Sequence, residues 1–439
     1  MSNEVTWFGH PRGLTVLFLT NMWEQFSYYG MRALLVYYMT KQLLMGQGAS
    51  SMVYGAYTAC AYFTPLIGGI IADQVLGKQR AIVIGGSVMA LGHFMMTQEP
   101  LFYPALATIA LGNGLFLPSL PSQIGDLYPR GDTRVGRAYN VYYVGVNIGG
   151  FLAPLVCGTL GEVLGWHWGF GAAGIGMLCG LMFYLWGRRY LPPQTLMKRP
   201  QQAVVQREGM ARATVLLLIG LGAAVTVFRS AYEQIGNTVA LWADSNVDKQ
   251  VGHFAIPMTW FISINPFCVV FLTPVLLAWW RRREGAGAIE APARRMAFGA
   301  LIVGASYLML AALAWSAGEL RVHWLWFAAF FVLLTLGELF ILPTGLGLFA
   351  RLAPPRFGAT TVASWFLATF AGSLAAGLLG TLWTSIGHPE FFVLLAAICA
   401  CAAVSLRLLD GYARQIAASA AATRTVESSD RATVDCRGS

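Results

Sequence analysis

The chain has 439 residues, of which 56% are hydrophobic and 11% are charged, and its mean hydropathy is +0.58. A soluble domain carries about twice that share of charged residues, so the composition excludes an ordinary soluble protein. The formal net charge of +9 would suit nucleic-acid binding, and the placement of the basic residues has to decide that question.

Twelve apolar stretches alternate with short polar segments along the chain. Each is about 20 to 30 residues long, which lets a helix cross a bilayer of roughly 30 Å. We therefore predict an all-α, polytopic membrane protein, without a cleaved signal peptide because the first stretch is too long for one. The predicted spans are 14–39, 51–74, 80–98, 101–128, 134–162, 166–189, 212–243, 252–281, 295–317, 322–352, 356–385 and 388–409.

The basic residues gather on one side of these spans. The loops on the other side carry only Lys41, Lys249 and Arg321, together with several acidic residues. The positive-inside rule then places both termini in the cytoplasm of a cell whose inner membrane holds the protein. The basic excess indicates membrane topology and contact with anionic lipids, and it argues against nucleic acid as a partner.

The longest polar interruption, 190–211, is rich in Pro and Gln and divides six spans from six. Two six-helix halves related by an axis along the membrane normal are the major facilitator arrangement. We therefore predict a cytoplasmic N-terminus at 1–13, a half at 14–189, a linker at 190–211 and a second half at 212–409. The remainder, 410–439, has no apolar period and is predicted to be a disordered cytoplasmic tail.

A charged motif follows the second span. The stretch GGIIADQVLGKQR ends that helix with Asp73, and Lys78 and Arg80 follow on the turn. It resembles the major facilitator loop between spans two and three, G-x-x-A-D-x-x-x-G-x-R/K. The resemblance implies that these three residues brace helix ends and couple their motion.

The first span contains NMWEQFSYYG, residues 21–30. It resembles the signature of proton-dependent oligopeptide transporters, E-x-x-E-R-F-x-Y-Y-G, in which Glu24, Tyr28 and Tyr29 match while Asn21 and Gln25 differ. Four later stretches resemble that family in the expected order. They are YYVGVNIGGFLAPLVCG (142–158), AYEQIGNT (231–238), WFISINPFCVVFLTP (260–274), and GELFILPTGLGLFARLAPPRF with SWFLATFAG (337–372).

The resemblance implies a central cavity that binds di- and tripeptides and opens alternately to the two sides of the membrane. Glu338, Asn265 and Asn147 would hold the ammonium end, and Arg32 with Glu233 would form an extracellular gate. Further substrate contacts are implied for Tyr28, Tyr29, Tyr62, Glu233, Gln234, Trp365 and Phe366. Proton coupling would use acidic groups, for which Glu24 and Glu233 are the candidates here.

The chain departs from the family where the peptide carboxylate is held. The Arg of the first motif is Gln25, the Lys of the fourth span is Leu117, and the first Glu of the proton cluster is Asn21. These changes are mutually consistent, because keeping one charge alone would leave it unpaired in a low-dielectric cavity. We expect weaker carboxylate recognition and altered coupling, with Glu24 either carrying the proton alone or staying protonated as a hydrogen-bond donor.

One cation has no counterpart in the motif. Arg229 lies one helical turn before Glu233, so both face the same side of a helix. It either neutralises Glu233 locally or supplies a substrate-facing cation, and the sequence leaves both readings open.

We predict a secondary transporter of small peptides or peptide-like compounds, monomeric, with no enzymatic activity, cofactor or metal. The alternatives are a proton-independent facilitator or exporter of a modified peptide or amine, and a peptide sensor that no longer transports. The sequence contains no phosphate-binding glycine loop, metal-ligand spacing or nucleophile motif.

Overall fold

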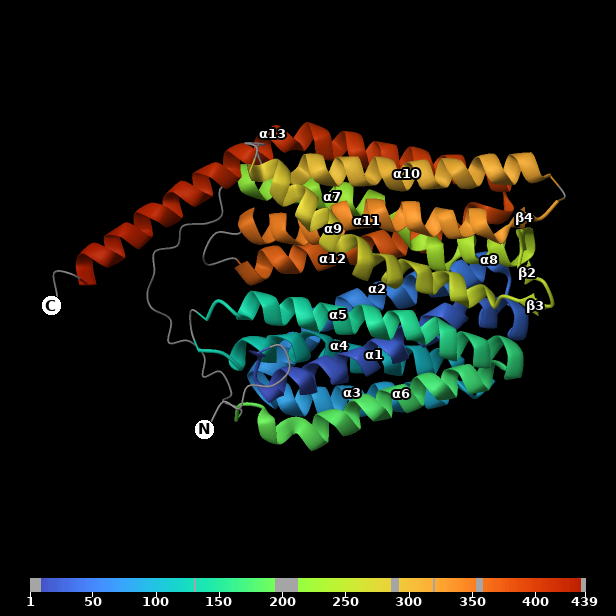
Figure 1. The fold of residues 1–439 in the computed structure, drawn as a ribbon, viewed down its shortest axis with the longest axis horizontal. Helices are drawn as coiled ribbons and strands as arrows, with labels where there is room; N and C mark the ends of the chain where they lie inside the picture. Colours follow the sequence, from blue (N-terminus) through green and yellow to red (C-terminus); the bar gives the residue numbers. More distant parts are fainter. Residues whose placement is uncertain are drawn as a thin grey trace.

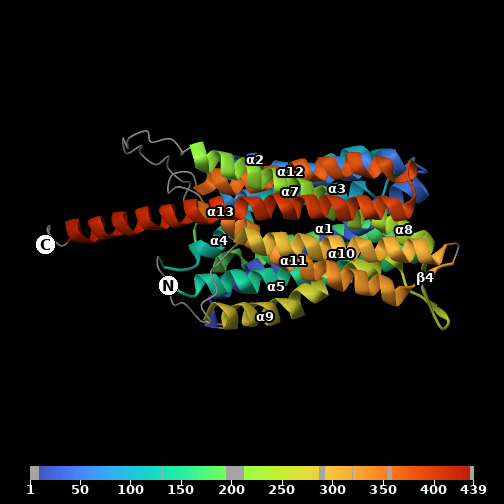
Figure 2. The ribbon, with the colours of Figure 1, turned by 90° about the horizontal axis from the view of Figure 1, so that it is seen from above.

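The structure, a computed structural model, describes residues 9–129, 132–193, 212–285, 292–318, 320–352 and 358–435. Within these ranges the chain forms two groups of roughly parallel helices that lie side by side in Figure 1 and overlap in the view from above in Figure 2. Most of the predicted linker lies outside the described residues, as do residues 1–8 of the predicted N-terminus and 436–439 of the tail.

The N-terminal half, drawn in blue to green in Figure 1, is a bundle of six long helices. They are α1 (Arg12–Tyr37), α2 (Gln47–Ile71), α3 (Lys78–Met95), α4 (Phe102–Asp126), α5 (Val135–Ala153) and α6 (Trp166–Gly187). π-Helical turns extend three of them. These turns are Tyr38–Gln42 after α1, Ala72–Leu76 after α2, and Pro154–Gly158 with Leu160–Leu164 after α5.

The C-terminal half, drawn in yellow-green to red, contains seven helices, of which the short α8 completes the span begun by α7. They are α7 (Arg212–Tyr232), α8 (Thr238–Asn246), α9 (Ile264–Gly285), α10 (Pro292–Ala317), α11 (Trp324–Leu352), α12 (Gly358–Gly380) and α13 (His388–Asp435). Short 3-10 helices occur in both halves. They are Glu99–Leu101 and Arg188–Tyr190 in the N-terminal half, and Glu233–Gly236, Met258–Ser263 and Thr381–Thr384 in the C-terminal half.

Four two-residue strands lie at the end of the bundle opposite the chain termini (Figure 1). β1 (Val247–Asp248) pairs in parallel with β4 (Val322–His323), and β2 (Gln250–Val251) pairs antiparallel with β3 (Phe254–Ala255). We call this end of the bundle the hairpin end. The opposite end, where α6 finishes and α7 begins, is called the linker end.

Long helices occupy all twelve predicted spans, which confirms the all-α, multi-pass fold. Ten helical segments in the described part of the chain are long and apolar enough to cross a membrane. α1 and α3 are outside that set: α1 holds Glu24, Gln25 and Arg32, and α3 has only 18 residues and begins with Lys78. Neighbouring helices rather than lipid must therefore surround much of α1.

Two predicted boundaries differ from the ends of the helices in the structure. The eighth span was expected from residue 252, but the β2–β3 hairpin turns at Gly252, whose φ is +61°, and helix resumes at Met258 after Pro257. The tail from residue 410 was expected to be disordered, but α13 continues to Asp435. The tail is rich in alanine, and a helix already nucleated in the preceding span needs only propagation to continue.

Matching glycine contacts relate the two halves. In the N-terminal half, a Cβ added to Gly85 would lie 2.7 Å from the carbonyl oxygen of Gly112, so α3 and α4 touch through their backbones. In the C-terminal half, a Cβ added to Gly299 would lie 2.6 Å from the carbonyl oxygen of Gly337, between α10 and α11. Third and fourth spans thus pack alike in both halves, as expected for a repeat built on small residues.

Candidate functional site

A cavity of about 620 Å³ lies between the two halves. Its lining extends from Arg32 and Tyr54, near the middle of the bundle, to Asn140, Leu346 and Trp280, close to the linker-end termini of α5, α11 and α9. Both halves contribute polar side chains to a mostly apolar wall. This size and lining are typical of sites for small organic ligands, which run to about 300–1,000 Å³.

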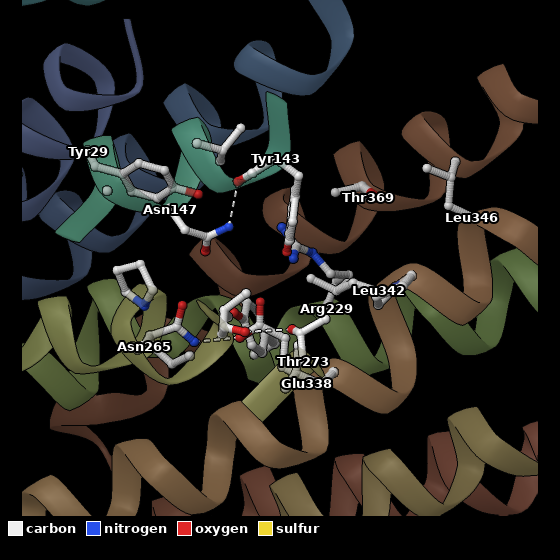
Figure 3. A pocket seen from close by; sticks show the side chains of 18 of the residues that line it. Tyr29, Tyr143, Asn147, Arg229, Asn265, Thr273, Glu338, Leu342, Leu346 and Thr369 are labelled. Carbon is white, nitrogen blue, oxygen red and sulfur yellow. Dashed lines mark hydrogen bonds between the residues drawn. The ribbon is translucent and has the colours of Figure 1, made fainter. Parts of the chain in front are cut away.

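One wall of the cavity is acidic. Glu338 of α11 accepts a hydrogen bond from the Asn265 amide of α9, at 2.5 Å, and the Tyr232 hydroxyl of α7 lies close to its carboxylate. The Asn265 amide nitrogen also lies 3.0 Å from the Thr335 hydroxyl. Figure 3 shows Glu338 and Asn265 facing the same space. Their positions on three helices fix a buried carboxylate where it can receive a cationic ligand group.

A cluster of two arginines and one glutamate lies nearby. The buried Glu233, just beyond the end of α7, forms ion pairs with both Arg32 of α1 and Arg229 of α7. The Tyr54 hydroxyl accepts a hydrogen bond from Arg32 Nε at 2.9 Å. The predicted gate pair is thus present, and Arg229 shares its carboxylate.

The N-terminal half provides the opposite wall. Tyr29 and Tyr62 line the cavity, as does Asn147, whose side-chain nitrogen donates to the Tyr143 carbonyl at 2.9 Å (Figure 3). Trp365 and Phe366 of α12 line it from the other half. These five side chains leave an aromatic and amide surface for the uncharged part of a ligand.

The residues that depart from the family motif lie outside the cavity lining, two of them in α1 beside Glu24 and one in α4. Glu24 is buried, and one carboxyl oxygen lies 2.7 Å from the Gln25 side-chain nitrogen while the other has no partner in the described chain. Asn21 donates to the Tyr142 carbonyl at 3.3 Å. Leu117 on α4 is half-buried and also lies outside the lining. A neutral amide therefore contacts Glu24 at the position where the motif has a cation.

The hairpin end is closed by contacts between the halves. Glu162 accepts hydrogen bonds from the backbone nitrogens of Met258 and Thr259, each at 2.9 Å, and from the Thr259 hydroxyl at 2.6 Å. Ser51 donates to the Asn237 side chain at 2.9 Å. These bonds cap the start of the eighth span with a carboxylate from the other half.

Two further inter-half contacts lie at the hairpin end. Lys41, after α1, forms an ion pair with Asp244 of α8 at 2.5 Å. Gly55 of α2 meets Gly377 of α12 so closely that an added Cβ would lie 2.5 Å from the Gly377 Cα. The cavity thus extends toward the linker end and is sealed from the hairpin end.

One of the three charged residues of the loop after α2 contacts another helix end through an ion pair. Lys78 pairs with Asp126 at the end of α4, at 2.6 Å, so this contact braces two helices of the same half. Asp73 and Arg80 are exposed. Coupling of motion through all three residues stays a prediction.

Three predicted substrate residues lie outside the cavity lining, namely Tyr28, Glu233 and Gln234. Gln234 is fully buried and uses its amide to bind the Ala376 carbonyl at 2.8 Å, and its oxygen accepts from Asn237 and Thr238. It therefore joins the break after α7 to α12. Tyr28 packs edge-on against Tyr29 and is likewise not part of the lining.

Several cavity or gate residues were missed from the sequence. Tyr232 contacts both Glu338 and Arg229, Tyr54 binds Arg32, and Glu162 caps the eighth span. Tyr232 directly precedes Glu233, which was a usable signal. Glu162 follows shortly after the motif at 142–158, whereas Tyr54 lies far from any motif in sequence. In the described part of the chain, no group of three His, Cys, Asp or Glu side chains is placed to hold a metal ion.

Known proteins resemble this chain along most of its length. A family model described as the POT family (PTR2) matches residues 79–213 and 194–391. The peptide transporter YePEPT of Yersinia enterocolitica is 32% identical, with 92% of this chain and 95% of that protein covered. A di-/tripeptide transporter of Lactococcus lactis subsp. cremoris is 28% identical, with 90% and 94% covered. A solved structure of a peptide transporter POT in complex with sulfate has a TM-score of 0.87 at 27% identity, covering 94% of this chain and 96% of that one.

Proposed function

Because this chain belongs to the POT family, we propose that it transports small peptides or peptide-like compounds by alternating access between its two halves. The observation that carries the proposal is the cavity between the halves, sealed at the hairpin end by Glu162, Lys41 and the Arg32–Glu233 pair. The similar proteins named above are described as transporters and not as enzymes.

The orientation in the membrane follows from charge. The linker end carries the basic residues, so the positive-inside rule places it and both termini at the cytoplasmic face of the inner membrane. The cavity then faces the cytoplasm, and the hairpin end is the closed extracellular gate. Opening that gate requires Arg32 and Glu233 to separate and the cavity to close at the linker end.

Proton coupling, in this proposal, uses Glu24, Glu233 or both. Glu24 is buried with one oxygen unpaired, and its only described partner is the neutral Gln25 amide. A carboxyl group without a cationic partner in an apolar environment can take up a proton without stranding a positive charge. Glu233 has two cationic partners, and protonating it would weaken the gate pair with Arg32.

Uptake by purified protein in proteoliposomes tests this function. Labelled dialanine and trialanine are supplied with an inward proton gradient, and again after the gradient is collapsed with an ionophore. Accumulation of peptide that requires the gradient supports proton symport. Equilibration of peptide across the membrane at the same rate with and without the gradient indicates a proton-independent facilitator. Saturable binding without flux would overturn transport and leave a sensor. Empty liposomes and Glu338→Ala protein are the controls.

A second candidate is transport of a modified peptide or amine without a free carboxylate. The replacement of the family's cations by Gln25 and Leu117 favours it, since the N-terminal half then offers no cation at those positions. The retained Glu338 and Asn265 suit an amine in either case.

A further inference from the structure

Arg229 has the position and the free hydrogen-bonding capacity of a ligand site. It lines the cavity although its side chain is only 4% exposed. Both of its described hydrogen bonds, to Glu233 and to the Tyr62 hydroxyl at 2.9 Å, use the same terminal nitrogen, Nη2. In the described chain the other terminal nitrogen, Nη1, has no partner, and Nε is enclosed without one. Arg229 therefore keeps N–H donors that Glu233 and Tyr62 do not use.

The guanidinium is also held in place before any ligand arrives. The ring of Tyr62 from α2 lies 5.2 Å from its central carbon, and the ring of Tyr232 from α7 lies 5.1 Å away. A cation between two aromatic rings is stabilised electrostatically and loses little freedom on binding. Gly372 of α12 makes room for the side chain, since an added Cβ there would lie 2.4 Å from the Arg229 Cβ.

The charges around the cavity balance and are separated. Arg32 and Arg229 are matched by Glu233 and Glu338. Glu338, with Asn265, forms a negative pole, and the two arginines around Glu233 leave a positive pole. Figure 3 shows Glu338, Asn265 and Arg229 among the residues that line the cavity. A zwitterion adds no net charge and presents a group to each pole. A peptide amide would bring one uncompensated positive charge into a low-dielectric site.

We propose that Arg229 binds the carboxylate of a zwitterionic ligand whose ammonium group binds Glu338. The proposal rests on the proposed transport function and names its substrate class. It assigns both charged ends of the ligand to the C-terminal half, on α7 and α11, and makes Arg229 replace the cations missing at Gln25 and Leu117. Arginine suits this task because its planar fork pairs with a carboxylate through parallel hydrogen bonds.

Binding of matched ligands tests the assignment. Dialanine, its C-terminal amide and its N-acetyl derivative are titrated against detergent-purified wild-type protein, with affinity read by calorimetry. The wild type is expected to bind dialanine at least about tenfold more tightly than the amide, the usual order of effect for losing one partner of a charged hydrogen-bonded pair. The N-acetyl derivative should lose affinity to a similar extent.

Three variants separate ligand recognition from a structural role. Arg229→Gln should weaken dialanine binding to the level of the amide and leave amide binding unchanged. Arg229→Lys should restore part of the preference, because it keeps the charge and loses the fork. The double variant Arg229→Gln/Glu233→Gln removes one charge of each sign and so restores the charge balance at the gate. It should still lack the preference for dialanine over the amide. The melting temperature of each variant checks that the protein is folded.

The outcomes are distinguishable. Equal affinity of the wild type for dialanine and its amide would overturn the role of Arg229 and leave peptide transport intact. An equal loss of affinity for dialanine and for its amide, in Arg229→Gln and in the double variant, would show that Arg229 has a structural role only. A wild type that binds none of the three compounds, and takes none up into proteoliposomes, would overturn the proposed function itself.

Discussion

The contact between Gly55 and Gly377 predicts a way to shift the balance between the two conformations. At this point α2 and α12 close the hairpin end backbone against backbone. A methyl group on Gly55 would lie 2.5 Å from the Gly377 Cα and 2.8 Å from the Ser373 carbonyl oxygen. Both neighbours are backbone, so neither can give way by rotating. Gly55→Ala should therefore force the halves apart at this end and destabilise the closed gate.

The size of the shift follows from the cost of overpacking, typically about 1–3 kcal/mol. If the halves separate as rigid bodies, this cost raises the population with an open hairpin end about 5- to 150-fold. Gly377→Ala should act more weakly, because its added Cβ would lie 3.1 Å from the nearest atom, the Ser51 carbonyl oxygen. Gly46→Ala is the matched control, since nothing lies within 4 Å of a Cβ there.

A buried reporter can measure this population. Ser51 is fully buried at the hairpin end, so a cysteine placed there, in protein lacking the seven native cysteines, reacts with a maleimide only when that end opens. The labelling rate should rise in Gly55→Ala by the factor above and stay at the reference value in Gly46→Ala. An unchanged rate in folded Gly55→Ala protein would show that this contact does not hold the gate closed.

Three further predictions use the same preparations. Glu162→Gln removes the negative charge that caps Met258 and Thr259, so it should lower the stability of the closed gate by about 1–2 kcal/mol, measured as faster labelling of the buried reporter. An unaltered rate would contradict the capping role. Glu24→Gln should abolish gradient-driven accumulation of dialanine while preserving exchange across the membrane, and accumulation that persists would move the coupling to another group. Gly372→Ala should displace Arg229 and reduce the preference for dialanine over its amide several-fold, whereas a methyl group on Gly347, which meets nothing within 4 Å, should leave that preference intact.

The helices could be predicted because a membrane imposes a minimum length and an apolar composition on each spanning helix, and both can be recognised in a single sequence. The break after α7 could not. Residues 231–238 read as continuous helix, yet the 3-10 turn at Glu233–Gly236 interrupts it. Gln234 stabilises that turn through the Ala376 carbonyl, a contact that depends on where α12 packs. The same packing removed Gln234 from the cavity, where its motif had placed it.

The residues that form the two charged poles of the cavity could be predicted from the sequence only in part. Glu338 and Asn265 could be assigned from motifs in α11 and α9. Tyr232 adjoins a motif residue, Glu233, but its proximity to Glu338 depends on the rotation of α7 relative to α11, which the sequence does not give. Arg229 was visible as a displaced cation, but its two readings differ only in which of its nitrogens are occupied. That distinction requires atomic positions.

The break after α7 has a mechanical consequence for the proposed cycle. It can act as a hinge, so that α8 tilts away from α1 while the part of α7 toward the linker end stays packed in its half. Separating Arg32 from Glu233 would ordinarily strand a buried charge at a cost of about 3–5 kcal/mol. Here Arg229, one turn before Glu233 at the end of α7, can stay paired with Glu233. When the gate opens, the Glu233 carboxylate therefore keeps one of its two cationic partners, and the charge that must find new partners is that of Arg32.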